Sequence, residues 1–211
     1  MSKNPQEHGQ EYHYNRAKKE GYRARSAYKL IDLQNRFNIF KRSFYILDLG
    51  SAPGSWLQVA KKYAEDNIGR YKDQYYHRDH YKIMGVDTKN IAPIEGIKVI
   101  KMDLTNPQFK NEIETYFNEN QIDLIISDAS INKSGNKFSD QSRQVNLCLE
   151  IIKLSKYLRV RGSLVVKLFQ GVDFDNFFKK MKETFVIVKS FKPRASNKKS
   201  NEIYLIGLKK K

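Results

Sequence analysis

Strand-like and helix-like segments alternate along most of this chain, and this alternation limits the possible folds more than any other feature. Apolar runs of strand length recur at residues 44–49, 82–87, 97–103, 122–128, 163–169, 184–191 and 202–208. The segments expected to be helical between them are 54–64, 108–120, 140–159 and 174–183. This alternation predicts an α/β fold with a mostly parallel seven-stranded sheet and helices on both faces.

The last two predicted strands break the pattern, because the loop KPRASNKKSN (192–201) joins them without a helix. Parallel neighbours need a long crossover connection, whereas a loop can join an antiparallel pair. We therefore expect the sheet to end in a C-terminal antiparallel hairpin. Before the first strand, residues 25–37 have the apolar spacing of an amphipathic helix.

The length of 211 residues predicts a single domain, 1–211. Within it we expect a basic, partly flexible N-terminal extension at 1–21 and a polar, aromatic surface insertion at 64–82. No apolar run approaches the roughly 20 residues that a membrane span requires, and the N-terminus has no secretory signal. Cys148 is the single cysteine, which excludes intrachain disulfides. We expect an intracellular, cytoplasmic protein, with nucleus or nucleolus as the alternative in a eukaryote.

The charge of the chain is strongly positive, with 39 Lys and Arg against 23 Asp and Glu, a net charge of +16. The stretch YNRAKKEGYRARSAYK (14–29) interleaves basic residues with tyrosines, and eight basic residues lie between Lys189 and Lys211. Cations bind phosphates and aromatic rings stack on unpaired bases, so this composition favours RNA as a partner. The alternative is a surface that is simply rich in lysine.

A metal site has little support in the sequence. His77 and His80 lie close together in the polar segment, but no third ligand accompanies them. Zinc takes at least three protein ligands, so two histidines at a surface are the better interpretation. We expect no metal.

The turn LDLGSAPGSW (47–56) follows the first predicted strand and opens a helix, where open α/β sheets bind nucleotide cofactors. A dinucleotide fingerprint would read G-x-G-x-x-G, but Ala52 and Ser55 stand at its second and third glycines. Pro53 also lacks the amide hydrogen that a phosphate would bind. The turn therefore predicts a cofactor with an adenosine and no phosphate, and it disfavours a dinucleotide oxidoreductase.

The pattern D-x-G-x-x-P-G-x-W in this turn resembles the S-adenosylmethionine site of the FtsJ family of ribose 2′-O-methyltransferases. Acidic residues at the ends of later strands agree with the resemblance, although such residues can also cap turns. The resemblance implies a Rossmann-like methyltransferase fold that binds S-adenosyl-L-methionine. The implied cofactor-binding residues are Gly50, Gly54, Trp56, Asp87, Asp103 and Asp128.

The resemblance extends to the catalytic Lys–Asp–Lys–Glu set of the family, carried here by RSAYKL, IISDAS, VVKLFQG and SNEIYL. The implied catalytic residues are Lys29, Asp128, Lys167 and Glu202. A ribose hydroxyl is a poor nucleophile until a base removes its proton, and burial or a second cation can make a lysine basic enough. We expect Lys167 to be the base, held by Asp128, with Lys29 and Glu202 positioning the ribose. The alternative for Lys167 is an exposed residue on an edge strand.

The substrate cannot be read from one motif. VVKLFQG and EIYLIG resemble the large-subunit ribosomal RNA uridine methyltransferases, whereas the N-terminal stretch also resembles tRNA anticodon-loop enzymes. We expect a monomer that acts on ribosomal RNA, with tRNA as the alternative and a non-catalytic RNA-binding assembly factor as the second. Ile131 departs from the family, which often has proline in this loop, so the loop's shape stays open.

Overall fold

The computed structural model describes residues 5–71, 78–118, 121–131, 134–171, 173–197 and 199–211. The strands are β1 Tyr45–Leu49, β2 Lys82–Asp87, β3 Lys98–Lys101, β4 Ile122–Ser127, β5 Leu158–Phe169, β6 Phe185–Phe191 and β7 Glu202–Lys210. They form one sheet in the order β3-β2-β1-β4-β5-β7-β6. The first five pair in parallel, whereas β7 is antiparallel to both β5 and β6. The predicted fold class and the C-terminal hairpin are therefore confirmed.

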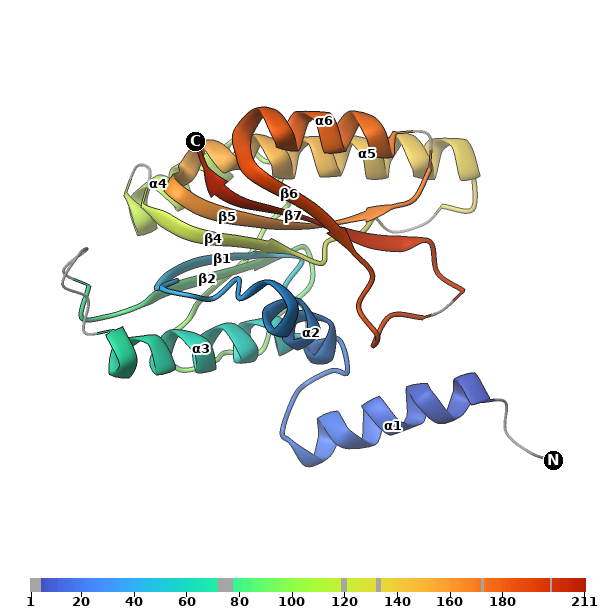
Figure 1. The fold of residues 1–211 in the computed structure, drawn as a ribbon, viewed down its shortest axis with the longest axis horizontal. Coiled ribbons are helices and arrows are strands. Elements are labelled where there is room, and N and C mark those ends of the chain that lie inside the picture. Colours follow the sequence, from blue (N-terminus) through green and yellow to red (C-terminus); the bar gives the residue numbers. More distant parts are fainter. Residues whose placement is uncertain (1–4, 72–77, 119–120, 132–133, 172, 198) are drawn as a thin grey trace.

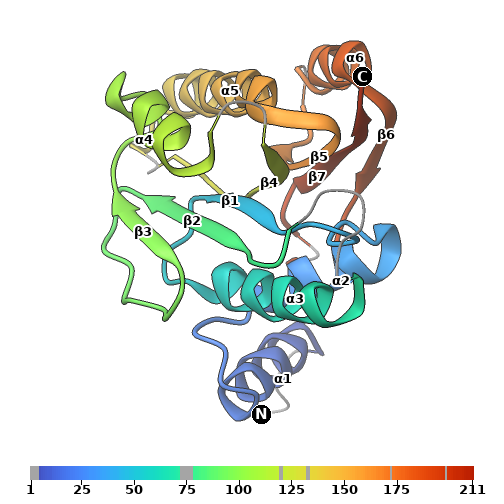
Figure 2. The ribbon, with the colours of Figure 1, turned by 90° about the vertical axis from the view of Figure 1, so that its left-hand side faces the viewer.

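Helices cover both faces of the sheet (Figures 1 and 2). They are α1 Pro5–Lys19, α2 Ala27–Phe37, α3 Ser55–Tyr71, α4 Gln108–Phe117, α5 Lys137–Lys153 and α6 Phe174–Thr184, with a 3-10 turn at Leu154–Tyr157. α2 and α3 pack on one face, α4, α5 and α6 pack on the other, and α1 lies farther from the sheet. None of the helices in the described part of the chain combines the length and apolar content that a membrane span requires.

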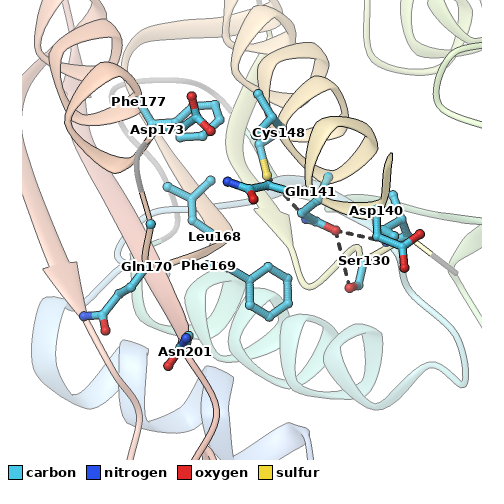
Figure 3. Close-up of a pocket in the computed structure, with 14 residues that line it drawn as sticks. Ser130, Asp140, Gln141, Cys148, Leu168, Phe169, Gln170, Asp173, Phe177 and Asn201 are labelled. Atoms are coloured by element: carbon cyan, nitrogen blue, oxygen red, sulfur yellow. Dashed lines mark hydrogen bonds between the residues drawn. The ribbon is translucent and has the colours of Figure 1, made fainter. Parts of the chain in front are cut away.

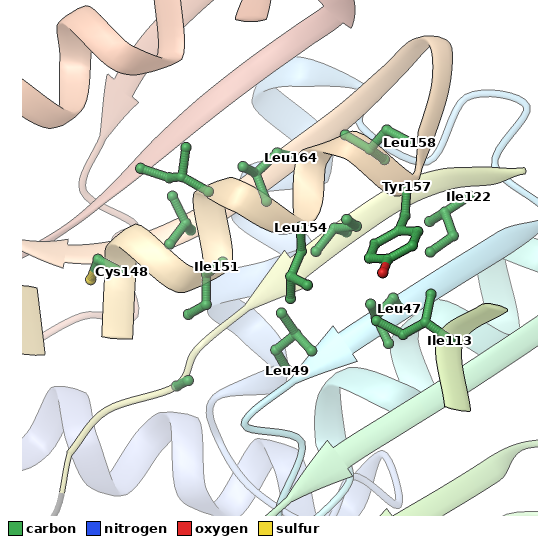
Figure 4. Packing of buried hydrophobic residues seen from close by; sticks show 14 of the residues in the cluster. Leu47, Leu49, Ile113, Ile122, Cys148, Ile151, Leu154, Tyr157, Leu158 and Leu164 are labelled. Atoms are coloured by element: carbon green, nitrogen blue, oxygen red, sulfur yellow. The ribbon is translucent and has the colours of Figure 1, made fainter. Parts of the chain in front are cut away.

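The core consists of two apolar layers, one on each side of the sheet. Every residue of β1 and β4 is buried, as expected for central strands that are covered on both faces. Alternate residues of a strand point to opposite faces, so Leu47 and Leu49 pack under α4 and α5 while Ile46 packs under α2 and α3. Figure 4 shows the first of these layers around Leu154 and Tyr157.

Two neighbouring elements, α5 and β5, differ from their sequence-based boundaries. β5 begins at Leu158, five residues before the predicted 163–169, and α5 ends at Lys153, before the predicted 159. Arg159 and Arg161 interrupt the apolar pattern of β5, so the first part of this strand was not recognised in the sequence. Arg159 is nevertheless bound by the buried Asp123, and Arg161 adopts a left-handed φ of 65° beside a shift in the β4–β5 register.

The N-terminal segment is more ordered than the sequence suggests. α1 is a helix within the 1–21 extension, and its last turn packs on α2: Ala17 is buried and the Arg16 guanidinium lies 4.7 Å from the centre of the Tyr28 ring. The Arg16–Tyr28 contact and the buried Ala17 thus attach the end of α1 to the domain.

The 64–82 surface insertion is also only partly what we expected. α3 continues to Tyr71 and buries Ala64 and Asn67, so the first part of this stretch belongs to the core. Residues 72–77, with His77, lie outside the described residues. Beyond them Arg78 is buried again, and the His80 Nε2 lies 2.9 Å from the Tyr45 hydroxyl oxygen.

Candidate active site

The glycine turn after β1 lies at the carboxyl edge of the sheet, where the loop after β4 approaches it. Gly50 has a φ of 76°, and a Cβ at this position would lie 2.5 Å from the Ala129 Cα. Only glycine satisfies both constraints, because a side chain would be strained and would collide with backbone. The motif glycine therefore brings the ends of β1 and β4 together.

A cavity of about 570 Å³ opens beside this turn. It falls within the size range of small-ligand sites and lies at the carboxyl ends of the parallel strands, where such folds bind cofactors. Four residues implied by the family resemblance line the cavity: Gly50, Asp87, Asp103 and Asp128. The structure thus brings together side chains that are separated by as much as a third of the chain.

Gly54 and Trp56, the other two implied cofactor residues, are not part of this cavity lining. Gly54 has a φ of 108°, and a Cβ there would lie 2.7 Å from the Arg23 Nη1. Trp56 is 3% exposed, donates from Nε1 to the Ser26 carbonyl at 2.8 Å, and packs against the Tyr204 ring. Both residues shape the turn from behind.

Asp87 and Asp103 hold turns as well as lining the cavity. The Asp87 carboxylate accepts hydrogen bonds from the amides of Ala52 and Lys89, both at 2.9 Å. Asp103 accepts from the amide and hydroxyl of Thr105, which lower the pKa of its carboxyl. A carboxylate has about four acceptor positions, so each residue retains capacity for a ligand.

One face of α5 forms the opposite wall of the cavity, and no sequence motif indicated it. Arg143, Asn146, Leu147 and Glu150 line the cavity at helical spacing. This spacing was visible in the sequence, but three of the four side chains are polar, so the pattern did not stand out as a buried face.

Asp48 is a further residue that the sequence-based site omitted, although it opens the D-x-G motif. It is completely buried, and neither carboxylate oxygen has a hydrogen-bond partner among the described residues. Burial raises the pKa of Asp48 well above its ordinary value, and the negative charges of Asp128 and Asp87 act in the same direction. The turn therefore has an unsatisfied acidic group directly behind the cavity.

Replacing Asp48 with Asn should change how stability depends on pH. A raised native pKa means that the folded protein binds a proton that the unfolded chain has released, so wild-type stability falls as pH rises from the ordinary aspartate pKa towards the raised one. We expect the Asp48→Asn variant to gain in free energy of unfolding relative to wild type between pH 5 and pH 8, by at most about 1.4 kcal/mol per pH unit.

Urea unfolding at several pH values without added ligand measures this difference. Asp103→Asn is the matched control: because the native pKa of Asp103 is lowered, its contribution is fully present above the ordinary pKa and is lost only as pH falls through the lowered one. Its difference from wild type should stay constant between pH 5 and pH 8. A constant difference for Asp48→Asn would contradict the buried-proton interpretation.

The four residues of the implied catalytic set form two ion pairs at the same edge of the sheet. The Lys167 Nζ lies 3.0 Å from the Asp128 Oδ1 and donates to the Asp128 carbonyl at 2.5 Å. The Lys29 Nζ lies 2.7 Å from the Glu202 Oε1. The expected hold of Asp128 on Lys167 is thus present, and each lysine has a carboxylate of its own.

Lys167 occupies an interior strand, since β5 lies between β4 and β7. Its side chain is 9% exposed, so the alternative of a solvent-facing lysine on an edge strand is wrong. The amine can therefore face a ligand while the apolar neighbours of Lys167 remain in the core.

Tyr204 is a supporting residue that no motif indicated. It pairs with Lys167 across β5 and β7, and its buried hydroxyl donates to the Asp128 Oδ1 at 2.6 Å. Asp128 is therefore held by both a lysine and a tyrosine, which fixes the direction of its carboxylate. The register of the antiparallel pair creates this contact, and the spacing of residues along the chain does not reveal it.

The loop after β4, where Ile131 departs from the family pattern, has a defined shape. The Ile131 amide donates to the buried Gln144 Oε1 at 3.0 Å, and Ser130 contacts the same oxygen at 3.5 Å. One buried amide of α5 therefore holds the loop without a proline.

Comparison with known proteins agrees with this site. The model of the FtsJ-like methyltransferase family matches residues 22–210. The large-subunit ribosomal RNA methyltransferase E of Methanosarcina acetivorans is 38% identical over 94% of this chain and 68% of its own length. The protein of the same name from Francisella philomiragia is 35% identical over 96% of this chain and 92% of its own length.

A solved structure shares the fold. The crystal structure described as a ribosomal RNA methyltransferase of Plasmodium falciparum matches with a TM-score of 0.73 and 29% identity, over 90% of this chain and 98% of its own. The family match covers the glycine turn, the strand-end acids and both ion pairs. This chain belongs to the FtsJ-like methyltransferase family.

Proposed function

We propose that the chain transfers a methyl group from S-adenosylmethionine to a ribose 2′-hydroxyl of large-subunit ribosomal RNA, with a uridine as the favoured nucleotide. Family membership makes it an S-adenosylmethionine-dependent methyltransferase. The names of the curated relatives support ribosomal RNA as the substrate. The observation that carries the proposal is the two largely buried lysine–carboxylate pairs, one of which contributes Asp128 to the lining of the cofactor-sized cavity.

The cavity suits this cofactor, which supplies a methyl group activated on a positively charged sulfonium. Its lining includes four acidic side chains, Asp87, Asp103, Asp128 and Glu150, against two basic ones, Lys89 and Arg143. The unpaired Asp48 lies behind the turn. Asp87 has the position to accept hydrogen bonds from ribose hydroxyls, and Asp103 the position to contact the adenine side. Gly50 leaves the backbone accessible, because no side chain covers it.

The catalytic chemistry falls to the two ion pairs. In its neutral form the Lys167 amine can accept the proton of the substrate hydroxyl, as the O–H bond breaks and the oxygen attacks the methyl carbon. Asp128 orients that amine and is itself oriented by Tyr204. Lys29 and Glu202, from α2 and β7, position the ribose. Holding the two reactants at attack distance supplies much of the acceleration in such a site.

The basic segments that flank α2 are the proposed RNA-binding surface. α1 precedes it, with Tyr12 and Tyr14 exposed. The basic loop between β6 and β7 is attached to it, since the Arg194 amide donates to the Asp32 Oδ2 at 2.8 Å. α2 carries Lys29, so cations lie on both sides of the proposed reaction site, and the exposed rings of Tyr12 and Tyr14 lie on the α1 side.

Methylation with labelled S-adenosylmethionine tests this function. Purified large ribosomal subunits that lack the modification and purified tRNA serve as substrates, and the 2′-O-methyl positions are mapped afterwards. We expect label in the subunits. Label in tRNA alone would favour the anticodon-loop alternative, and RNA binding without any label would favour the non-catalytic assembly factor.

A further inference from the structure

A second cavity of about 440 Å³ lies beside the first, and nothing in the proposed cofactor site uses it. Ser130 and Ile131 line both cavities, so a single loop separates them. The second cavity is bounded by α5 on one side and by the ends of β5 and α6 on the other, as Figure 3 shows. A ligand that spans both would pass the loop after β4.

Residues that line the second cavity are neighbours, along the chain, of two proposed catalytic residues. Lys167 is followed in β5 by Leu168 and Phe169, and both line the cavity. Asn201, another lining residue, directly precedes Glu202. The second cavity therefore lies at the same edge of the sheet as Lys167 and Glu202, although neither side chain lines it.

The lining combines an aromatic ring, apolar floor and side-chain amides. Phe169 is 37% exposed, and Figure 3 shows its ring between the strand ends and the loop at Ser130. Leu168 and Phe177 form buried apolar surface. The amide side chains that line the cavity are Gln141, Gln144, Gln170 and Asn201.

Charge excludes a phosphate as the occupant. The net charge of the protein is +16, yet the described residues that line this cavity include no Lys or Arg. They do include Asp140 and Asp173. Hydrogen bonds from Ser134 lower the pKa of Asp140, so it is ionised at neutral pH. Asp140 pairs with Arg143 at 2.5 Å, so the lack of a lining cation, rather than a free negative charge, disfavours the phosphates of an RNA backbone. A flat, neutral group with polar edges fits this lining.

We propose that this cavity receives the base of the nucleotide whose 2′-hydroxyl is methylated, turned out of the RNA stack. The inference rests on the proposed function, because it takes the ribose to lie at Lys167. The base stacks on Phe169, and its edge is recognised by the amides of Gln141, Gln170 and Asn201. RNA-binding proteins read unstacked bases in this way, through aromatic rings and hydrogen bonds to base edges.

Kinetics of Phe169 variants test the proposal on modification-free large subunits. We expect Phe169→Ala to lower kcat/KM for RNA roughly 10- to 100-fold, the range for losing one base stack. Phe169→Trp should stay near wild type, because it retains a ring. Val186→Ala, at an exposed apolar residue of β6, is the matched control, and calorimetry should give unchanged affinity for S-adenosylmethionine in all three variants. Activity of Phe169→Ala within twofold of wild type would overturn the proposal.

A binding measurement separates this proposal from the function on which it rests. In NMR spectra of the wild-type protein, uridine 5′-monophosphate should shift the side-chain amide signals of Gln141, Gln170 and Asn201, whereas ribose 5-phosphate should not. Such shifts without methylation of any RNA would support the base site while refuting the proposed function. Methylation without them would support the function and overturn the base site. Gln141→Ala provides a second variant if Phe169→Ala does not fold.

Discussion

Replacing Lys167 with Ala is expected to reduce methyl transfer by about 10²- to 10⁴-fold, the usual contribution of a general base. The side chain is buried between β4 and β7 and is held by both the carboxylate and the carbonyl of Asp128. No other lysine of the described chain shares these contacts, so no neighbour can replace it. Single-turnover methylation of large ribosomal subunits measures the loss, and calorimetry should show that S-adenosylmethionine still binds.

Two further variants separate the base role from the charge and from general damage. Lys167→Arg keeps a positive charge that a protein cannot deprotonate, so it should be nearly as inactive as Lys167→Ala if proton removal matters. Lys98→Ala removes another lysine that pairs with a carboxylate at 2.7 Å, Glu112, far from the cavity, and should leave the rate unchanged. Substantial activity in Lys167→Arg would contradict the assignment of Lys167 as the base. It would mean that the residue acts only through its positive charge.

Replacing Asp123 with Asn is expected to lower the free energy of unfolding by about 3–5 kcal/mol, the usual cost of removing one partner from a buried ion pair. Asp123 is buried near the amino end of β4, on the opposite edge of the sheet from the proposed site. It accepts hydrogen bonds from the Phe44 and Tyr45 amides at 2.7 and 2.8 Å and from Arg78 at 2.5 Å, and it also contacts Arg159. Asn would remove the carboxylate that the buried Arg78 and the partly buried Arg159 both contact.

Urea unfolding at pH 7 measures this loss. Glu112→Gln is the control, because it breaks a partly exposed ion pair with Lys98 that should contribute at most about 1 kcal/mol. Below the unfolding transition, Asp123→Asn should bind S-adenosylmethionine with wild-type affinity, since Asp123 does not line the cavity. A loss below about 1 kcal/mol would mean that solvent or local rearrangement compensates the arginines.

The fold follows closely from local sequence patterns. Apolar runs and helical spacing located all seven strands, and the absence of a helix between residues 191 and 202 indicated the antiparallel end of the sheet. The errors occurred where charge interrupts those patterns. The start of β5 was missed because Arg159 and Arg161 resemble loop residues, and the burial of Arg159 against Asp123 depends on a contact across 36 residues.

The candidate site was predictable only as a set of residue types at strand ends. Motifs identified Lys29, Asp128, Lys167 and Glu202, and parallel strands bring such ends to one edge. Motifs could not show that Trp56 packs behind the turn rather than lining the cavity, nor that Asp48 is buried without a partner. The packing of Trp56 and the burial of Asp48 depend on which face of the sheet each side chain points to.

By itself, the sequence determined the order of strands and helices, the glycine turn and the identity of the charged groups, because these depend on neighbours along the chain. Only the tertiary structure decided how those charges pair. Lys167 meets Asp128, and Tyr204 supports the same carboxylate, through the alignment of β5 with β4 and β7. A shift of one residue in that alignment would turn each side chain to the other face, so long-range register determines whether the motif residues form a site.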